Sequence, residues 1–183
     1  MAEVNGPGER SEIPLSAPVP LTAEHDVSAF DCGEPALNDW LRHRALKNES
    51  RFSRTYIVCA GTQVIAHFCI SVGAVGRAAA PGKVRRNAPD TIPVSVIGRL
   101  AVDRHHAGKG LGADMLADAL RRIAVVSQSI GIGAVLVHAK DDAAKRFYLK
   151  HAEFIEYPAG SHTLFLPIET VVAGFSLPAP LPG

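Results

Sequence analysis

The sequence has little cysteine, which excludes a fold held together by disulfides. Its 183 residues contain three cysteines, Cys32, Cys59 and Cys69. If Gly61-Thr62 is a hairpin turn, Cys69 lies about five residues along the strand from the position facing Cys59, roughly 16 Å away at ~3.3 Å per residue. Unpaired cysteines are typical of a reducing compartment, so we expect a cytoplasmic protein.

Long hydrophobic runs and metal-binding patterns are also missing. No apolar run approaches the ~20 residues that a membrane-spanning helix needs, so no membrane partner is expected. The eight histidines show no metal-ligand spacing with the cysteines, and we expect no metal site. Residues 1–20 are rich in proline and lack the basic start and apolar centre of a signal peptide. We expect a flexible leader over 1–20, one compact domain over 21–170 and a tail over 171–183.

Acidic residues are absent from Ser50 to Pro89, although the net charge of the whole chain is only +1. A stretch of one sign on a nearly neutral protein indicates a surface for a polyanion. The alternative is a solvated loop that happens to be basic. The charged residues of this stretch are Arg51, Arg54, Arg77, Lys83, Arg85 and Arg86.

The most informative segment that is present runs from Gly98 to Gly112. It predicts a buried strand, a glycine-spaced turn and then an amphipathic helix. Such a turn points unpaired N–H groups and the positive end of the helix dipole at one place, which suits a phosphate. The spacing matches neither a nucleotide-triphosphate loop nor a dinucleotide fingerprint. The alternative is a helix that simply follows a flexible loop. The candidate phosphate-binding residues are Ala107, Gly108, Lys109, Gly110, Leu111 and Gly112.

A second segment, Val135 to Tyr148, predicts a short apolar strand followed by a helix with an acidic start. Asp141 or Asp142 is placed to cap the free N–H groups of that helix. The helix carries Ala144, Phe147 and Tyr148.

Together the two segments resemble the GNAT family of N-acetyltransferases. Three stretches, 98–103, 30–41 (Phe-Asp-Cys-Gly-Glu-Pro-Ala-Leu-Asn-Asp-Trp-Leu) and 163–168, are similar to the acetyltransferase toxins of bacterial toxin–antitoxin pairs. The resemblance covers about 21 to 168. It implies a single α/β domain whose mixed central sheet is flanked by helices, with a splayed central strand pair that binds acetyl-CoA.

The resemblance also implies roles for particular residues. The glycine turn would hold the coenzyme A diphosphate, with Asp141, Ala144 and Phe147 completing the cofactor site. Main-chain groups of Leu100, Ala101 and Val102 would line the pantetheine arm, and the Val102 N–H would stabilise the oxyanion. Tyr148 would protonate the leaving thiolate; the alternative for Tyr148 is a core aromatic. His106, Glu34 and Asp103 stay open as bases, and a strong base is not required because a free α-amine has a pKa of about 8.

The similar toxins imply the remaining partners. They acetylate the amino acid of charged tRNA, are neutralised by a ribbon-helix-helix antitoxin, and form homodimers. The expected tRNA contacts are Arg77, Lys83, Arg85, Arg86 and Arg99, although Arg99 is equally compatible with a structural ion pair. Two rival functions remain: acetylation of a small amine or a protein N-terminus, and coenzyme binding by an inactive regulator.

Two departures from the family pattern bear on the site. Ala107 stands where the family usually has Gln or Arg, which removes a side-chain contact but keeps the N–H donors. Phe154 comes one residue later than in the usual Gly-Phe pair, so the bend after the Tyr148 helix is expected to differ.

The periodicity predicts these elements: a helix over 35–47 with Pro35 near its start, a hairpin of strands 55–60 and 63–72, a strand over 94–102 preceded by Pro93, a helix over 110–130, a strand over 134–139, a helix over 141–150, and short strands around Phe154 and Phe165. The predicted buried positions of the two long helices are Leu37, Trp40, Leu41 and Leu46, and Leu111, Met115, Leu116, Ala119, Leu120 and Ile123.

Overall fold

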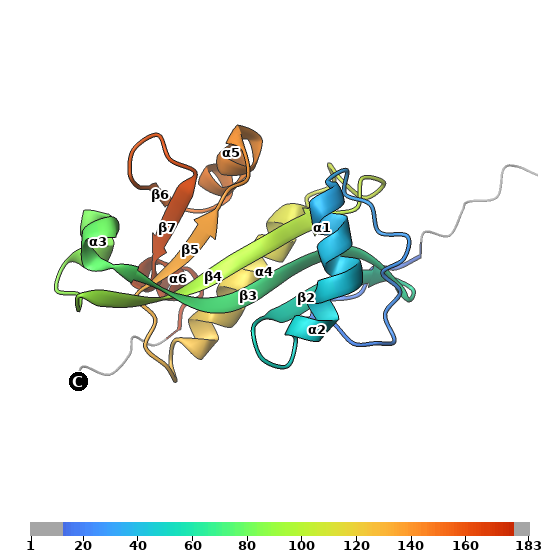
Figure 1. Cartoon of the computed structure of the whole chain (residues 1–183), viewed down its shortest axis with the longest axis horizontal. Helices are drawn as coiled ribbons and strands as arrows, with labels where there is room; N and C mark the ends of the chain where they lie inside the picture. Colours follow the sequence, from blue (N-terminus) through green and yellow to red (C-terminus); the bar gives the residue numbers. More distant parts are fainter. Residues whose placement is uncertain (1–12, 178–183) are drawn as a thin grey trace, which may run out of the picture.

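The computed structural model describes residues 13–177, which form one seven-stranded sheet with helices on both faces (Figure 1). The strand order is β1-β2-β3-β4-β5-β7-β6. Only the β4–β5 pair within these residues is parallel, so the sheet is mixed, as predicted. The strands are β1 (Val19–Pro20), β2 (Arg54–Ala60), β3 (Gln63–Gly76), β4 (Thr91–Val102), β5 (Ala134–His138), β6 (Ile155–Glu156) and β7 (Thr163–Pro167).

The predicted hairpin is confirmed, with Cys59 opposite Val64 across the β2–β3 turn. All three cysteines are free. The strands β3 and β4 are longer than predicted and pair out to Gly76 and Thr91. Pro93 therefore lies inside β4 and not at its first position. The Pro93 carbonyl accepts a hydrogen bond from Gly133 N–H (2.8 Å), just before β5 begins. The proline nitrogen, which carries no hydrogen, lies on the same edge of β4 as this carbonyl. No hydrogen bond of the ladder is therefore lost.

The parallel pairing between β4 and β5 is short. It joins Val94–Val96 to Ala134–Leu136 and stops there, although β4 continues to Val102. Beyond Val96 the two strands diverge, and this confirms the predicted splayed pair.

The helices occupy both faces of the sheet (Figure 1). On one face lie α4 (Leu111–Val126), α5 (Asp142–His151) and α6 (Ile168–Gly174), which share a core with alternate strand residues such as Val135 and Val137. On the other face, α1 (Pro35–Trp40) packs over β2–β4, and α3 (Gly82–Arg85) packs near Leu136 and Phe165. The first helix continues through a π-helical segment, Leu41–Ala45, into α2 (Leu46–Asn48).

Most predicted helix burial is confirmed, with three exceptions. Trp40, Leu41, Met115, Leu116, Ala119, Leu120 and Ile123 are buried. Leu37 and Leu111 are half-buried. Leu46 is 47% exposed, because Ala45, four residues after Leu41, takes the buried position on that face. Helix α4 also ends at Val126 and not at Ile130, where Ser127 Oγ donates to the carbonyl of Ala124 (2.7 Å).

The expected leader and tail are too long. Val19–Pro20 pairs with β2, and the hydroxyl of Ser16 accepts a bond from Cys59 N–H (2.9 Å). Edge strands tolerate proline, which is why this segment reads as a loop in the sequence. At the other end, Val171 and Val172 belong to α6 and are buried in the core. The rest of the expected leader and tail, 1–12 and 178–183, lies outside the described residues.

Candidate functional site

The glycine turn forms a cradle of free N–H groups at the start of α4. Gly108 and Gly110 have φ values of 76° and 84°, which only glycine adopts easily. The first bond within the helix runs from Asp114 N–H to the Gly110 carbonyl (3.1 Å), and no side chain caps the helix. The N–H groups at positions 111–113 therefore remain available to an anion at the positive end of the helix dipole.

Gly112 has a different role from the other two glycines. A Cβ built on Gly112 would lie 3.5 Å from the Phe147 ring and 3.8 Å from Val102, at ordinary contact distance. The three residues come from α4, α5 and β4. The two segments that the sequence analysis singled out therefore meet here, and Phe147 supports the cradle from the side.

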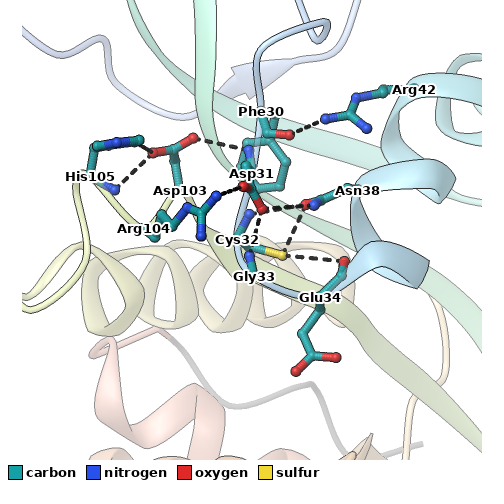
Figure 2. Close-up of polar contacts among 10 residues, drawn as sticks. All are labelled: Phe30, Asp31, Cys32, Gly33, Glu34, Asn38, Arg42, Asp103, Arg104 and His105. Atoms are coloured by element: carbon teal, nitrogen blue, oxygen red, sulfur yellow. Dashed lines mark hydrogen bonds and ion pairs between the residues drawn. The ribbon is translucent and has the colours of Figure 1, made fainter.

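Asp103 ties the turn to the segment before α1 (Figure 2). Its buried carboxylate accepts from the N–H groups of Asp31 (3.0 Å) and His105 (2.9 Å), and the His105 ring lies 3.1 Å away. Burial by itself would raise the pKa of Asp103, but these hydrogen bonds outweigh it and the pKa is lowered. A carboxylate that is ionised and already occupied as an acceptor is a poor general base. The prediction that left Asp103 open as a base is therefore not supported by its surroundings.

The segment from Phe30 to Trp40 has a structural task that its sequence did not reveal. Asp31 forms an ion pair with Arg104, and its carboxylate accepts from Gly33 N–H (2.9 Å) and Asn38 Nδ2 (3.0 Å) (Figure 2). Asn38 Oδ1 in turn accepts from Cys32 N–H (3.0 Å). This network holds the start of α1 against the glycine turn. No signal in the sequence indicated the link to the turn, because Asp31 and Arg104 are 73 positions apart in the chain.

The open edge of β4 faces the gap between β4 and β5. Asp103 N–H donates to the Ile65 carbonyl of β3 (2.8 Å), so the preceding N–H, that of Val102, points to the opposite edge by the alternation of a strand. That edge has no ladder partner beyond Val96. Val102 and Leu100 are half-buried, and the Ala101 side chain is buried under α1. The backbone here can bind an extended ligand as an added strand.

Tyr148 lies buried in α5, whose start is capped as predicted by Asp141. Asp141 Oδ1 accepts from Ala144 N–H (2.8 Å), and Ala144 packs against the core. The Tyr148 ring packs edge-on against Phe147 (5.2 Å) and Phe154 (5.8 Å). Burial, and then the nearby Cys69 thiol, raise the pKa of Tyr148 to about 12. The phenol therefore stays protonated at neutral pH, as a general acid must.

Phe154 reaches the tyrosine despite its later position in the sequence. Helix α5 ends at His151, and the backbone is extended at Ala152. Phe154 is buried beside Tyr148. The expected difference in the bend leaves this aromatic contact intact.

Glu34 and Lys140 meet near the start of α1. Their side chains form an ion pair of 2.6 Å, and the hydrogen bond with Glu34 raises the pKa of Lys140. Glu34 precedes α1 and Lys140 follows β5, so the pair links the two sides of the splay. Sequence reasoning missed Lys140. His106, the remaining candidate base, is half-buried with Nδ1 3.8 Å from the Asp103 carboxylate.

The structure divides the basic stretch into two groups. Lys83, Arg85 and Arg86 lie together on and just after α3, exposed, on the same face of the sheet as α1. Within residues 13–177 no ion pair involves them. Arg77 is held by Asp90 (3.4 Å). Arg51 and Arg54 instead line a cavity with Arg122 of α4, on the other face, and do not join the α3 group.

No helix in the described part of the chain has the length and apolar character to cross a membrane. No group of three or more His, Cys, Asp or Glu side chains among the described residues is arranged to hold a metal ion.

Comparisons with known proteins agree with this geometry. The model of the acetyltransferase (GNAT) family matches residues 21–154. A tRNA-acetylating toxin of Mycobacterium tuberculosis is 45% identical over 140 residues, which cover 76% of this chain and 84% of the toxin. The structure of AtaT complexed with acetyl-methionyl-tRNAfMet has a TM-score of 0.80 and 31% identity, covering 88% of this chain and 99% of that one. A Tyr-to-Phe mutant of the AtaT toxin, bound to the C-terminus of the antitoxin AtaR and to acetyl-CoA, has a TM-score of 0.76 and 30% identity, covering 89% and 99%.

Proposed function

Because the chain belongs to the GNAT family of acetyltransferases, we propose that it transfers the acetyl group of acetyl-CoA to the α-amine of aminoacyl-tRNA and thereby blocks translation. The observation that carries this proposal is the splay of β4 from β5 after Val96, which leaves the edge of β4 free up to the turn that forms the N–H cradle of α4. The similarity to the tRNA-acetylating toxin supports the choice of acceptor.

The cofactor would be held mainly by backbone groups. The N–H groups at the start of α4, from Leu111 on, bind the diphosphate, while Gly108 and Gly110 shape the turn. The replacement of the usual Gln or Arg by Ala107 leaves these donors in place. Leu100 and Val102 pair with the pantetheine arm along the free edge of β4.

The chemistry requires an oxyanion donor and an acid. Val102 N–H points to the free edge of β4 and stabilises the negative charge that develops on the carbonyl oxygen. Such a donor typically contributes ~3 kcal/mol. Tyr148 O–H donates its proton to the departing thiolate. Because burial raises the pKa of Tyr148 to about 12, the phenol carries its proton at neutral pH and can donate it to the departing thiolate.

The acceptor would approach on the α1 and α3 face. Lys83, Arg85 and Arg86 form a cationic surface there, with no ion pair among residues 13–177, that suits the phosphates of an RNA stem. Arg77 contributes less, since Asp90 already neutralises it. Arg99 lies on the same face beside Trp40.

The wider partners follow from the relatives. We propose that the protein works in the cytoplasm, as its three free cysteines suggest. Neutralisation by an antitoxin is supported by the AtaT complex with AtaR. The ribbon-helix-helix class of that antitoxin and the homodimer rest on the resemblance to the toxins.

One assay tests the function directly. Purified protein is incubated with labelled acetyl-CoA and, separately, a pool of charged tRNAs, free amino acids, polyamines and N-terminal peptides. We expect label on charged tRNA alone, and a much slower appearance of that label with Tyr148→Phe. Label on a small amine or a peptide would favour the rival acetyltransferases. Binding of acetyl-CoA with no transfer to any acceptor would favour an inactive regulator.

A further inference from the structure

Arg99 has an unusual backbone conformation at the point where β4 leaves β5. Its φ is 56°, in the left-handed region, which costs a non-glycine residue about 1–2 kcal/mol. The conformation belongs to a bulge: Cys69 pairs with Gly98 and His67 with Ala101, so β4 has one residue more than β3 in this interval. Bulges and left-handed residues re-aim side chains and are concentrated at ligand sites.

The bulge directs the Arg99 guanidinium onto a buried aromatic cluster under α1. Its central carbon lies 4.7 Å from the centre of the Trp40 ring. Trp40 stacks on His67 (6.0 Å, 21°), and the Phe30 ring meets His67 edge-on at 5.0 Å. Trp40 is 5% exposed, and Phe30 and His67 are completely buried. These three rings, the aromatic platform, hold the guanidinium in one place by cation–π contact and packing.

The carboxylates that form ion pairs in the described part of the chain do so with other residues and not with this cation. Within residues 13–177 Arg99 makes no ion pair, whereas Arg77 and Arg104 each face a carboxylate. Burial, and then the Arg99 charge, lower the pKa of His67 to about 3, so the imidazole is neutral. Burial raises the pKa of Cys69 to about 11, so this neighbour is a neutral thiol. Arg99 is thus an exposed positive charge, without an ion pair among residues 13–177, next to the free edge of β4 that the proposed function assigns to the cofactor.

The chemistry of the proposed acceptor decides what such a charge would bind. In an aminoacyl-tRNA end, the carboxyl group is esterified, the ribose and the base are neutral, and the amine is neutral or positive. The phosphodiesters are the only groups there that are always negative, and a guanidinium binds phosphate by paired hydrogen bonds.

We infer that Arg99, held on the aromatic platform, binds the phosphate nearest the esterified amino acid and so positions the α-amine for attack. This inference rests on the proposed function, since it names the part of that acceptor which Arg99 holds. Arg99 is a positioning residue in this scheme, and it takes no part in the proton transfers.

The kinetic test removes the phosphate from the substrate. Acetyl transfer is measured on charged tRNA, on an aminoacyl-CCA trinucleotide and on 3′-O-aminoacyl-adenosine without a 5′ phosphate. For Arg99→Gln we expect kcat/KM to fall ~10- to 50-fold on the first two substrates, mainly through KM, and to stay unchanged on the third. Arg121→Gln, on the opposite face of the sheet, is the matched control. An equal loss on the phosphate-free substrate, or no loss on any, overturns the inference.

A binding test does not depend on turnover. Trp40 is the single tryptophan of the chain, so its fluorescence reports on the platform directly. Titration of the acetyl-CoA-free protein with uncharged CCA trinucleotide should change this fluorescence in the wild type, and adenosine should not. Arg99→Gln should abolish the change while retaining acetyl-CoA binding as evidence of folding. Equal responses of wild type and variant to CCA would contradict the inference. Failure of wild-type protein to acetylate charged tRNA would instead contradict the proposed function.

Discussion

The carboxylate of Asp103 accepts a hydrogen bond of 3.0 Å from the backbone N–H of Asp31, across 72 positions of the chain. Asp103 directly follows β4 at the start of the segment that leads into the glycine turn, and Asp31 precedes α1. The contact couples the cradle for the cofactor to the helix that flanks the acceptor side. Asp103 and Asp31 are therefore better understood as parts of the frame than as reacting groups.

Replacement of Asp103 should weaken this frame. Asp103→Ala leaves the N–H groups of Asp31 and His105 without their acceptor, and we expect a loss of about 1–3 kcal/mol in the free energy of unfolding. Urea denaturation measures it. Asp90→Ala is the control, because the Asp90 side chain is 95% exposed. Equal midpoints for the two variants would show that the Asp103 bonds contribute nothing.

Replacement of Gly110 should weaken cofactor binding. Gly110→Ala places a side chain at a φ of 84°, which costs about 1–2 kcal/mol, and the turn would relax away from its present shape. Calorimetry should show acetyl-CoA binding weakened roughly tenfold, because the relaxed turn no longer holds the N–H groups of the cradle in place. Gly131→Ala, where an added Cβ meets nothing within 4 Å and φ is not positive, should bind normally. Unchanged affinity in Gly110→Ala would place the diphosphate elsewhere.

Replacement of Tyr148 should affect turnover and spare binding. Tyr148→Phe keeps the ring packing and removes the proton donor, so kcat should fall about 10²- to 10⁴-fold with little change in acetyl-CoA affinity. Because the pKa of Tyr148 is raised to about 12, wild-type activity should not decline between pH 8 and 10 through loss of this proton. Tyr157→Phe is the control. A Tyr148→Phe enzyme with wild-type kcat would exclude the acid role.

Reversal of the charges on and just after α3 should reduce activity on charged tRNA and leave acetyl-CoA binding unchanged. The Arg85→Glu, Arg86→Glu double variant should bind acetyl-CoA normally and lose activity on charged tRNA, with a shallower salt dependence because fewer phosphates are neutralised. The double variant Arg51→Glu, Lys150→Glu changes the charge by the same amount away from α3. If both double variants lose activity equally, overall charge and not the α3 surface governs the interaction with tRNA.

His67 should make stability depend on mildly acidic pH. Its pKa is lowered to about 3 in the folded protein from 6.5, so the unfolded chain binds more protons between these values and stability falls as pH decreases from about 6.5. The slope for one proton approaches ~1.4 kcal/mol per pH unit. The lowered carboxyl pKa values act only below about pH 4.5. His67→Phe should flatten the unfolding free energy between pH 6.5 and 4.5, and an identical slope in both proteins would refute the assignment.

Features set by a few neighbouring residues could be predicted well. The N-cap of α5 at Asp141 and the positive φ of Gly108 and Gly110 follow from local backbone chemistry. The buried face of α4 follows from its periodicity. Local reasoning was less successful where a distant segment decides the outcome. In the sequence, the edge strand β1 resembles a loop and the helix α6 resembles a tail. Their structure depends on the pairing of β1 with β2 and on the packing of α6 against the core.

By itself, the sequence determined the strand-turn-helix with its N–H cradle, the capped helix that carries Tyr148, and the basic stretch before β4. Only the tertiary structure decided that the Asp103 carboxylate accepts a hydrogen bond from Asp31 N–H and that Lys140 forms an ion pair with Glu34. It also placed Arg85 and Arg54 on different faces of the sheet and the Arg99 guanidinium over the Trp40 ring. The physical reason is that hydrogen bonds and ion pairs between distant residues, and the burial that raises the pKa of Tyr148, depend on which segments the fold brings together.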